Sequence, residues 1–314
     1  MEDSNKIPSS LNHYMKSKSF KDKHIIITGG TGAIGSCVLY NLLQCGSKIV
    51  AFYHKSIPSN PKLNSYINSK KLIFIQCDFE NISSKLTDKF KEAITLLEGI
   101  LDILIFCHGK FFQGDIRSVK TISFDDNLKI NVRANFHFLS LAVPFLKITK
   151  GNVVMISSIE TKIVERGDFL HALGKSMINS LVQNSALELA SYGIRINAVA
   201  PSFVESGFRK DAMSEIKNNK YLEQMRGFHL LNQKLTTPEE IADVILFLAS
   251  NDAIFMTGEI INVDCGYELN HDLSFLQKDE INKNDFEENY NDNININNNY
   301  KKAINNFEFS GNNF

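Results

Sequence analysis

Several features are scarce in this chain of 314 residues, which contains no tryptophan, six prolines and five cysteines. The cysteines are far apart and form no C-x-x-C pair, which excludes a zinc site or a redox dithiol built on that motif; they lie at Cys37, Cys45, Cys77, Cys107 and Cys265. Scattered thiols are typical of reduced proteins, so we expect a cytoplasmic location. No apolar run approaches the roughly 20 residues that cross a bilayer, and the first residues lack the apolar core of a leader peptide. Neither a membrane span nor a leader is therefore expected.

An excess of charge of either sign is also lacking. The 34 basic and 35 acidic residues leave a formal net charge of −1. Such a balance creates no field that would gather nucleic acid or an anionic membrane. Hydrophobic residues make up 43% of the chain, which is ample for a core. The balanced charge therefore favours a small molecule as the binding partner and argues against nucleic acid or a membrane.

The most informative stretch is a glycine-rich turn at residues 28–35. It follows the apolar run 25–27 and opens a helical stretch at 34–44. Three of its glycines fit G-x-G-x-x-G, a spacing that permits a sharp turn, close approach of the backbone to a pyrophosphate, and tight packing of helix on strand. The free N–H groups of the helix start would then hold the phosphates. The predicted contact residues are Thr28, Gly29, Gly30, Thr31, Gly32, Ile34 and Gly35.

Apolar runs and amphipathic stretches alternate along the rest of the chain. The sequence predicts strands at 24–28, 48–53, 71–77, 101–107, 152–157, 195–199 and 259–263, and helices at 34–44, 84–97, 121–147, 169–192 and 238–249. The short continuous apolar runs are typical of strands that are buried on both faces of a parallel sheet. We therefore predict one domain of the α/β class, a doubly wound parallel sheet in three α/β/α layers (a Rossmann fold). Residues 202–235 are expected to be irregular.

The two ends of the chain differ from this middle in composition. Residues 1–21 are polar and rich in Ser and Lys, and are predicted to be a flexible arm. Residues 22–269 are predicted to form the dinucleotide-binding domain. From 270 to 314 Asn, Asp, Glu and Lys dominate, so this tail lacks the apolar surface needed to order itself and is predicted to be disordered.

Motif by motif, residues 22–269 resemble the single-domain short-chain dehydrogenase/reductase family. The similarity rests on the glycine turn together with Ile130-Asn131-Val132, the Ser157-Ser158 pair after a strand, Arg195 through Pro201, and Thr257 through Gly266. The resemblance implies a carbonyl/alcohol oxidoreductase with NAD or NADP. It implies that Asn131 supports a proton relay, Ser158 orients the substrate oxygen, and Lys175 holds the ribose. It further implies cofactor contacts from Asp78 (to the adenine), Phe79, His108, Gly109, Lys175, Pro201, Val204 and Ser206.

Two departures from the family pattern stand out. The segment after the fourth strand reads Phe106-Cys107-His108-Gly109 and keeps only the glycine of the family's Asn-Asn-Ala-Gly. The Tyr-x-x-x-Lys pair reads His171-Ala172-Leu173-Gly174-Lys175, so histidine stands where the family has its proton-donating tyrosine. The lysine and the spacing from Ser158 are retained.

Histidine at this position leaves two hypotheses open. Residues 171 and 175 are one helical turn apart and share a face, and imidazole is the commonest general acid or base. However, its nitrogen reaches less far than a tyrosine hydroxyl, and the neighbouring ammonium disfavours imidazolium. Asp168 could pair with His171, although an Asp just before a helix is more often the N-cap. The chain is thus either an active reductase or dehydrogenase, or a dinucleotide-binding sensor or scaffold with little catalysis. The sequence indicates no metal site.

The end of the second strand bears on the choice of cofactor. An acid there would bind the ribose 2′-hydroxyl of NAD, whereas basic residues suit a 2′-phosphate. The chain has Tyr53-His54-Lys55 and no acid, which favours NADP, with NAD still possible. The segment 203–235 is either a substrate lid or ordinary core packing. By resemblance, helices 121–147 and 169–192 would pair with copies of themselves in a homodimer or homotetramer.

Overall fold

The computed structural model describes residues 13–14, 18–57, 60–80, 84–114, 116–165, 167–205, 219–231 and 233–270. Ser206 and the predicted tail from residue 271 onward lie outside the described residues. The compact unit that contains the sheet extends to Asn270, next to the domain end expected at 269.

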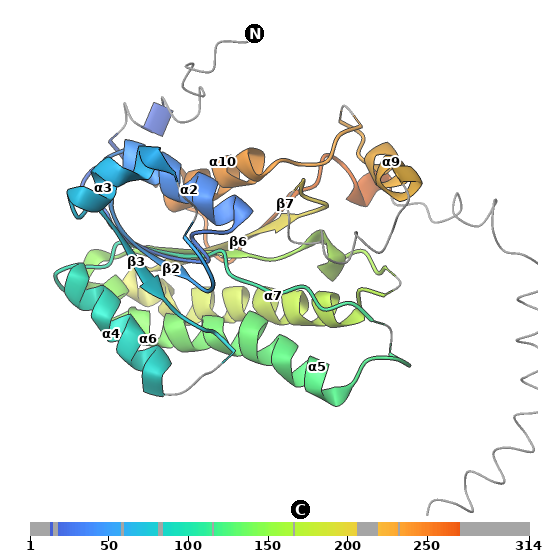
Figure 1. Cartoon of the computed structure of the whole chain (residues 1–314), viewed down its shortest axis with the longest axis horizontal. Helices are drawn as coiled ribbons and strands as arrows, with labels where there is room; N and C mark the ends of the chain where they lie inside the picture. The colour runs from blue at the N-terminus through green and yellow to red at the C-terminus, as the bar shows by residue number, and fades with distance from the viewer. Residues whose placement is uncertain are drawn as a thin grey trace, which may run out of the picture. The chain divides into compact units, whose positions relative to one another are not determined.

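Seven parallel strands form one sheet in the order β3-β2-β1-β4-β5-β6-β7 (Figure 1). The strands are β1 (His24–Thr28), β2 (Lys48–Tyr53), β3 (Leu72–Gln76), β4 (Ile103–Phe106), β5 (Asn152–Ile156), β6 (Arg195–Pro201) and β7 (Ile260–Val263). The order reverses between β1 and β4, so a crevice opens at their carboxyl ends, where ligands of doubly wound sheets bind. The predicted α/β class, the parallel sheet and its single domain are confirmed.

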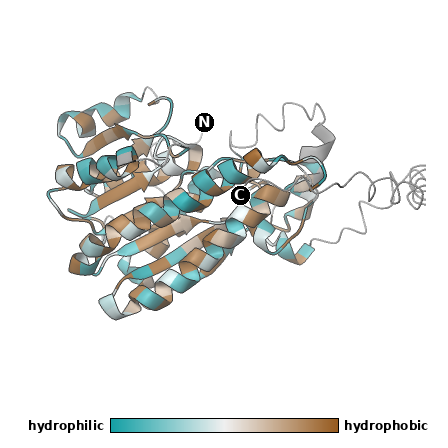
Figure 2. Cartoon of the chain, turned by 90° about the horizontal axis from the view of Figure 1, so that it is seen from below, coloured by the Kyte–Doolittle hydropathy of each residue, from teal (hydrophilic) through white to brown (hydrophobic). Residues whose placement is uncertain are grey.

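Helices cover both faces of the sheet, as Figure 1 shows. The helices are α2 (Ala33–Gln44), α3 (Asn64–Asn68), α4 (Ser84–Leu96), α5 (Thr121–Asn127), α6 (Ala134–Thr149), α7 (Phe169–Leu189), α9 (Asn219–Phe228) and α10 (Pro238–Ala249). One core layer packs α2 and α10 against the sheet, and the other packs α4, α6 and α7. In Figure 2 the strands are mostly hydrophobic, whereas the helices carry both hydrophobic and hydrophilic residues. This distribution follows from burying strands on both faces and helices on one.

Besides shifts of one to three residues at several element ends, three features differ from the sequence prediction. The helix expected at 121–147 is three segments, because residues Leu128–Arg133 form a π-helical turn (η2) between α5 and α6. The strand expected to stop before Pro201 includes it, pairing Pro201 with Val263 of β7. The region 202–235, expected to be irregular, contains the helix α9.

Part of the segment expected to be a flexible arm packs into the domain. Phe20 is fully buried and Tyr14 nearly so, and their rings meet edge to face with centroids 5.5 Å apart. Both belong to the core layer of α2 and α10. The described part of residues 1–21 therefore covers the domain rather than extending from it.

Described residues of the segment 203–235 form a small third core. Phe203, Met225 and Leu235 are buried with Tyr267 and two isoleucines of the loop after β5. Of the two interpretations left open for this segment, core packing applies to these residues.

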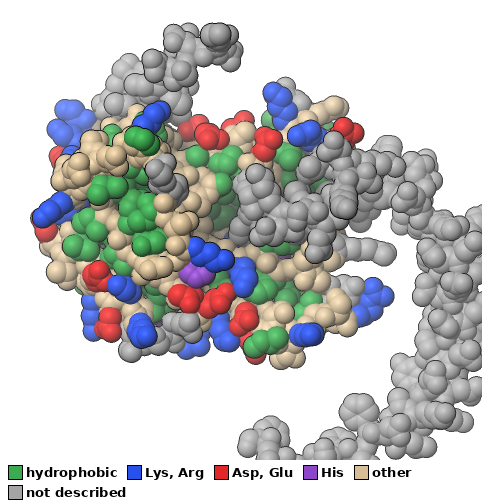
Figure 3. All heavy atoms as spheres, in the orientation of Figure 1, with side chains coloured by type: hydrophobic (Ala, Val, Ile, Leu, Met, Phe, Trp, Pro, Cys, Tyr) green, Lys and Arg blue, Asp and Glu red, His purple; other side chains and the backbone are tan. Residues whose placement is uncertain are grey.

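Among the described residues, no helix is long and apolar enough to cross a membrane. All five cysteines lie in the described part and are free thiols. On the face drawn in Figure 3, acidic and basic side chains are interspersed rather than separated by sign.

Candidate active site

The glycine turn between β1 and α2 is built for close approach. Gly29 has φ +67°, and a Cβ there would lie 2.7 Å from the backbone of His108. A Cβ on Gly35 would lie 2.2 Å from the carbonyl oxygen of Gly29, so helix and turn could not pack as they do. A Cβ on Gly32 would meet only the Gly29 carbonyl, at 3.3 Å, within a 4 Å radius. Gly29 and Gly35 are therefore required for packing, while Gly32 keeps its side of the turn open.

The start of α2 has the properties of an anion site. Its N-cap is Gly32, no side chain caps the first turn, and that turn contains no acidic residue. The first N–H groups of a helix have no partner inside the helix and carry the positive end of its dipole. A diphosphate fits these donors and the open side of Gly32.

A cavity of about 310 Å³ extends from this turn along the carboxyl ends of the central strands. Its walls contain most of the predicted site residues, namely Gly29, Thr31, Gly32, Ile34, Gly35, His54, His108, Gly109, Ser158, His171, Lys175, Pro201 and Val204. It also contains residues that were not predicted to belong to the site: Ala33, Cys107, Ile156, Ser157, Glu160 and Ser202.

Other predicted residues lie around the cavity rather than in its wall. Asn131 and Phe79 are buried, the exposed Lys55 follows β2, and Asp78 follows β3 with a carboxylate oxygen 3.9 Å from Nε2 of His54. Tyr53 ends β2 and packs edge to face on Phe74, with ring centroids 6.1 Å apart. Gly30 packs closely on Ala51, and Thr28 is buried at the end of β1.

Two adjacent serines after β5 have different surroundings. Ser157 donates its hydroxyl to Oδ1 of Asn179. Ser158 is the N-cap of the short turn η3 (Ile159–Thr161), where its Oγ accepts the N–H of Glu160 at 3.3 Å. Both line the cavity, and Ser158 stands at the expected distance in sequence from His171.

Lys175 lies in the cavity wall, on α7. Its Nζ donates to the carbonyl oxygen of Ile156 at 2.7 Å. Burial lowers the pKa of Lys175 to about 8, although the nearby Glu160 carboxylate acts in the opposite direction. Cys107 faces this ammonium, and burial raises the pKa of its thiol to about 12. The Cys107 thiol therefore stays protonated at neutral pH and adds no charge to the site.

His171 is 5% exposed and lies one turn before Lys175 on α7. Its Nε2 is 3.8 Å from Oε2 of Glu160, which is itself only 4% exposed. This separation is typical of an ion pair and longer than a hydrogen bond. The centroid of its ring lies 5.1 Å from that of Phe111.

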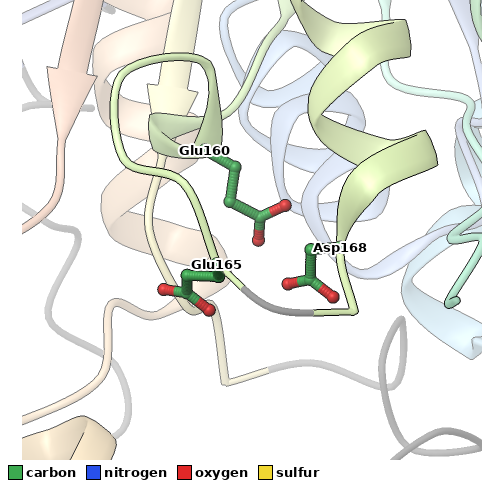
Figure 4. Close-up of side chains that lie close together, drawn as sticks. All are labelled: Glu160, Glu165 and Asp168. Carbon is green, nitrogen blue, oxygen red and sulfur yellow. The ribbon is translucent and has the colours of Figure 1, made fainter. Parts of the chain in front are cut away.

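Two more acids converge on Glu160, as Figure 4 shows. Carboxylate oxygens of Glu160, Glu165 and Asp168 all lie within 4.8 Å of one another. Asp168 occupies the N-cap position of α7 but makes no side-chain capping hydrogen bond, so the expected cap is absent. Glu165 accepts a hydrogen bond from the hydroxyl of Tyr267 at 2.6 Å.

His108 has a structural position in the floor of the site. Its Nδ1 lies 2.7 Å from Oγ1 of Thr28, and its Nε2 lies 3.1 Å from the carbonyl oxygen of Ile130. The ring stacks on Phe79, with centroids 4.1 Å apart and planes 13° apart. Phe79 thus supports the His108 side chain from the core layer of α4 and α6.

Asn131 lies in the π-helical turn η2 and fixes the loop after β4. Its side chain accepts the N–H of Lys110 at 2.9 Å and donates to the Lys110 carbonyl oxygen at 2.8 Å. Its own carbonyl oxygen accepts the side-chain amide of Asn135 at 2.7 Å. Asn131 therefore holds one wall of the cavity in place.

Glu160 is the charged residue of the cavity wall that sequence reasoning missed. It follows Ser158 by two residues, and an acidic residue at such a position in the sequence would be expected to be an exposed charge on a turn. Only the fold shows that this turn directs Glu160 inward, to a histidine eleven positions later. The unusual His171 was the one signal that a charged partner should be sought.

Comparison with known proteins agrees with the sheet and the cavity. Residues 30–268 match the profile of the family described as Enoyl-(Acyl carrier protein) reductase. The chain is 27% identical over 241 residues to the 3-oxoacyl-(acyl-carrier-protein) reductase FabG of Buchnera aphidicola, covering 76% of this chain and 95% of that one. It is 26% identical over 257 residues to a tropinone reductase homologue of Arabidopsis thaliana, covering 80% and 94% of the two chains. The chain belongs to the short-chain dehydrogenase/reductase family of oxidoreductases.

Solved structures share the same fold. The aldohexose dehydrogenase of Thermoplasma acidophilum in ligand-free form superposes with a TM-score of 0.72 at 23% identity, covering 80% of this chain and 96% of that one. The Cj0485 dehydrogenase gives a TM-score of 0.74 at 23% identity with the same coverage.

Proposed function

We propose that this protein is an NADP-preferring reductase or dehydrogenase that interconverts a carbonyl and an alcohol, with His171 in the acid/base position. The observation that supports it most is the meeting of Ser158, His171 and Lys175 in one cavity beside an uncapped helix start. The first two residues would face the substrate oxygen, and the third would hold the ribose of the cofactor.

The chemistry divides between cofactor and chain. When bound, the nicotinamide supplies or accepts the hydride at the substrate carbon. Ser158 donates a hydrogen bond to the substrate oxygen and fixes its position. His171 would give a proton to that oxygen in reduction, so that an O–H bond forms as an imidazole N–H bond breaks; the new C–H bond takes its hydride from the C–H bond of the reduced cofactor, and the carbonyl π bond is lost. Asn131 keeps the loop after β4 in place for the proposed proton relay.

The proposed cofactor site extends from the glycine turn to the end of β2. The α2 start would hold the diphosphate, and His54 and Lys55 would face a 2′-phosphate. His54 lies in the cavity wall and Lys55 is exposed beside it in sequence. The absence of an acid at the end of β2 supports NADP over NAD.

Catalysis is tested by following oxidation of NADPH with a panel of ketones and aldehydes. We expect turnover by the wild type, loss of at least 100-fold in kcat for His171→Phe, as for a general acid, and little change for the control His137→Gln on α6. A silent wild type combined with an active His171→Tyr would overturn the enzymatic proposal. The chain would then be a dinucleotide-binding sensor or scaffold.

Cofactor choice is tested by calorimetry with NADPH and NADH. A tighter Kd for NADPH is expected, and Lys55→Glu should weaken NADPH by about tenfold, the size of one charge-assisted contact, without weakening NADH. The exposed Lys62→Glu serves as the control for a general change of charge. An equal loss of both cofactors in Lys55→Glu, or tighter binding of NADH by the wild type, would contradict the preference.

We also propose self-association through α6 and α7. These helices and η2 border an apolar surface hollow with Leu128, Val132, Phe136, Met177 and Leu181 in its walls. Phe136 is 58% exposed, which is unusual for so large an apolar side chain and typical of an interface. Light scattering should give the mass of a dimer or tetramer for the wild type and of a monomer for Phe136→Asp. A monomeric wild type would overturn this proposal.

A further inference from the structure

In the candidate active site a positively charged side chain lies close to His171 and disfavours protonation of its imidazole. His171 and Lys175 are one turn apart on α7, and both are buried in the same cavity wall. A buried ammonium disfavours a second cation beside it, which would leave His171 neutral and a poor acid at neutral pH. A proton donor at this position needs a compensating negative charge.

Glu160 has the position and burial to provide that charge. Its Oε2 lies 3.8 Å from Nε2 of His171, and the carboxylate also raises the pKa of Lys175. Placing a carboxylate in a site where it is 4% exposed carries a large desolvation cost, which a paired cation offsets. The Lys175 ammonium and the His171 imidazole, both on α7, thus lie near one carboxylate of the facing turn.

We propose that Glu160 is a positioning residue that keeps His171 protonated and directs its Nε2, so that histidine can replace tyrosine as the proton donor of this site. The proposal rests on the proposed function for its catalytic meaning. Its electrostatic content, the control of His171 protonation by Glu160, can be measured without catalysis.

Two further acids lie beside Glu160. Glu165, from the loop before α7, and Asp168, at its N-cap position, bring carboxylate oxygens within 4.8 Å of those of Glu160 (Figure 4). The Phe111 ring contacts His171, and Cys107, which lines the same cavity near Lys175, adds no charge because burial raises the pKa of its thiol. Lys175 is the opposing charge among these groups. Glu160 is the carboxylate that lies next to the imidazole, and Glu165 and Asp168 add negative charge beside it.

The proton balance of one reduction follows from this arrangement. The imidazolium of His171 would transfer its proton to the substrate oxygen, and the bound cofactor would supply the hydride to the carbon. A neutral imidazole then remains beside the Glu160 carboxylate, and it recovers a proton from solvent before the next turnover. Glu160 forms no bond to the substrate in this sequence.

The test compares Glu160→Gln, which removes the charge but keeps the shape, with Glu268→Gln. Glu268 pairs with Lys162 at 3.2 Å and does not line the cavity, so it serves as the matched control. The pKa of His171 is measured by NMR titration of the full chain, assigned with His171→Phe. We expect a decrease of at least one unit in E160Q, a tenfold change in acid dissociation, and no change in E268Q. The conservative Glu160→Asp should lie between wild type and E160Q.

Activity provides the second readout. Because the protonated imidazole is the donor, the kcat for reduction should fall above the pKa of His171, and this limb should move to lower pH in E160Q. An unchanged pKa of His171 in both E160Q and E160D overturns the proposal, whether or not the protein is active. A shifted pKa in a protein that never turns over supports the role of Glu160 and overturns the proposed function alone. If E160Q does not fold, as judged by thermal unfolding, the E160D titration decides.

Discussion

The ring of His108 connects the carboxyl ends of β1 and β4, with Nδ1 2.7 Å from Oγ1 of Thr28. Because Nε2 faces the Ile130 carbonyl oxygen, that nitrogen carries the proton and Nδ1 accepts the threonine hydroxyl. Burial lowers the pKa of His108 to about 3. His108 is therefore a neutral imidazole that makes two hydrogen bonds.

This relationship predicts a dependence of stability on pH. The unfolded chain binds a proton at His108 near pH 6.5 and the folded chain only near pH 3, so the free energy of unfolding should fall by up to about 1.4 kcal/mol per pH unit as pH drops between these values. Urea unfolding of wild type and His108→Asn should show a shallower slope for the variant. The difference isolates His108 from His229, whose pKa burial also lowers. Equal slopes would show that His108 is accessible to protons in the folded state.

The second prediction concerns the glycine turn, where one substitution should affect both the stability of the protein and its affinity for the cofactor. Gly35→Ala would place a Cβ 2.2 Å from the Gly29 carbonyl oxygen, and relieving this overlap should cost about 1–3 kcal/mol of stability and weaken cofactor binding. The control is Gly227→Ala in α9, where a Cβ would meet nothing within 4 Å. That change should leave stability equal or higher by up to about 1 kcal/mol, since alanine favours a helix. Thermal unfolding and calorimetry measure both effects, and normal stability in Gly35→Ala would contradict the packing described.

The pKa of Lys175 predicts how the affinity for the cofactor changes at alkaline pH. Its pKa of about 8 means that the ammonium is lost above this pH, and with it the charge that would hold the ribose. The Kd for NADPH should therefore rise between pH 7 and 9 in the wild type. In Lys175→Arg the guanidinium stays charged, so its Kd should be flat over this range even if weaker at pH 7. Parallel curves for the two proteins would assign the effect to another group.

Much of this architecture could be predicted because its physical causes are local. Apolar runs such as 25–27 define strands that are buried on both faces. A glycine is needed at position 35 because the first turn of α2 packs directly against the preceding turn at Gly29. The boundaries of β2 and α10 were predicted correctly, and the latter begins with a capping box at Thr237 and Glu240.

The remainder depends on contacts between distant segments. The burial of Phe20 is set by its packing partners in the core of α2 and α10, not by the polar residues around it. The π-helical turn at Leu128–Arg133 accompanies the Asn131 bonds to Lys110, twenty-one positions earlier. The role of Glu160 in the site depends on the packing of η3 against α7, which brings its carboxylate next to His171.

The last prediction concerns the hydrogen bond that links Ser202, in the cavity wall after β6, to His229 after α9. Ser202, in the cavity wall, lies with its Oγ 2.8 Å from Nε2 of His229, which follows α9, and Nδ1 of His229 lies 2.6 Å from the Met225 carbonyl oxygen. His229 is fully buried, so removing either partner leaves a buried polar group unsatisfied, at about 1–3 kcal/mol.

The cost should appear as local opening rather than global unfolding, because the described apolar side chains Met225 and Phe228 of α9 pack in the small third core. We expect Ser202→Ala to increase hydrogen exchange in 219–231 several-fold while exchange in β1 and β4 stays unchanged. The control Ser36→Ala removes a hydroxyl that bonds within α2, to the Ala33 carbonyl oxygen at 3.0 Å, and should leave 219–231 unaffected. If exchange rises equally in the sheet and in 219–231, the Ser202–His229 bond stabilises the whole domain. If exchange in 219–231 does not change, α9 is held by its apolar contacts alone.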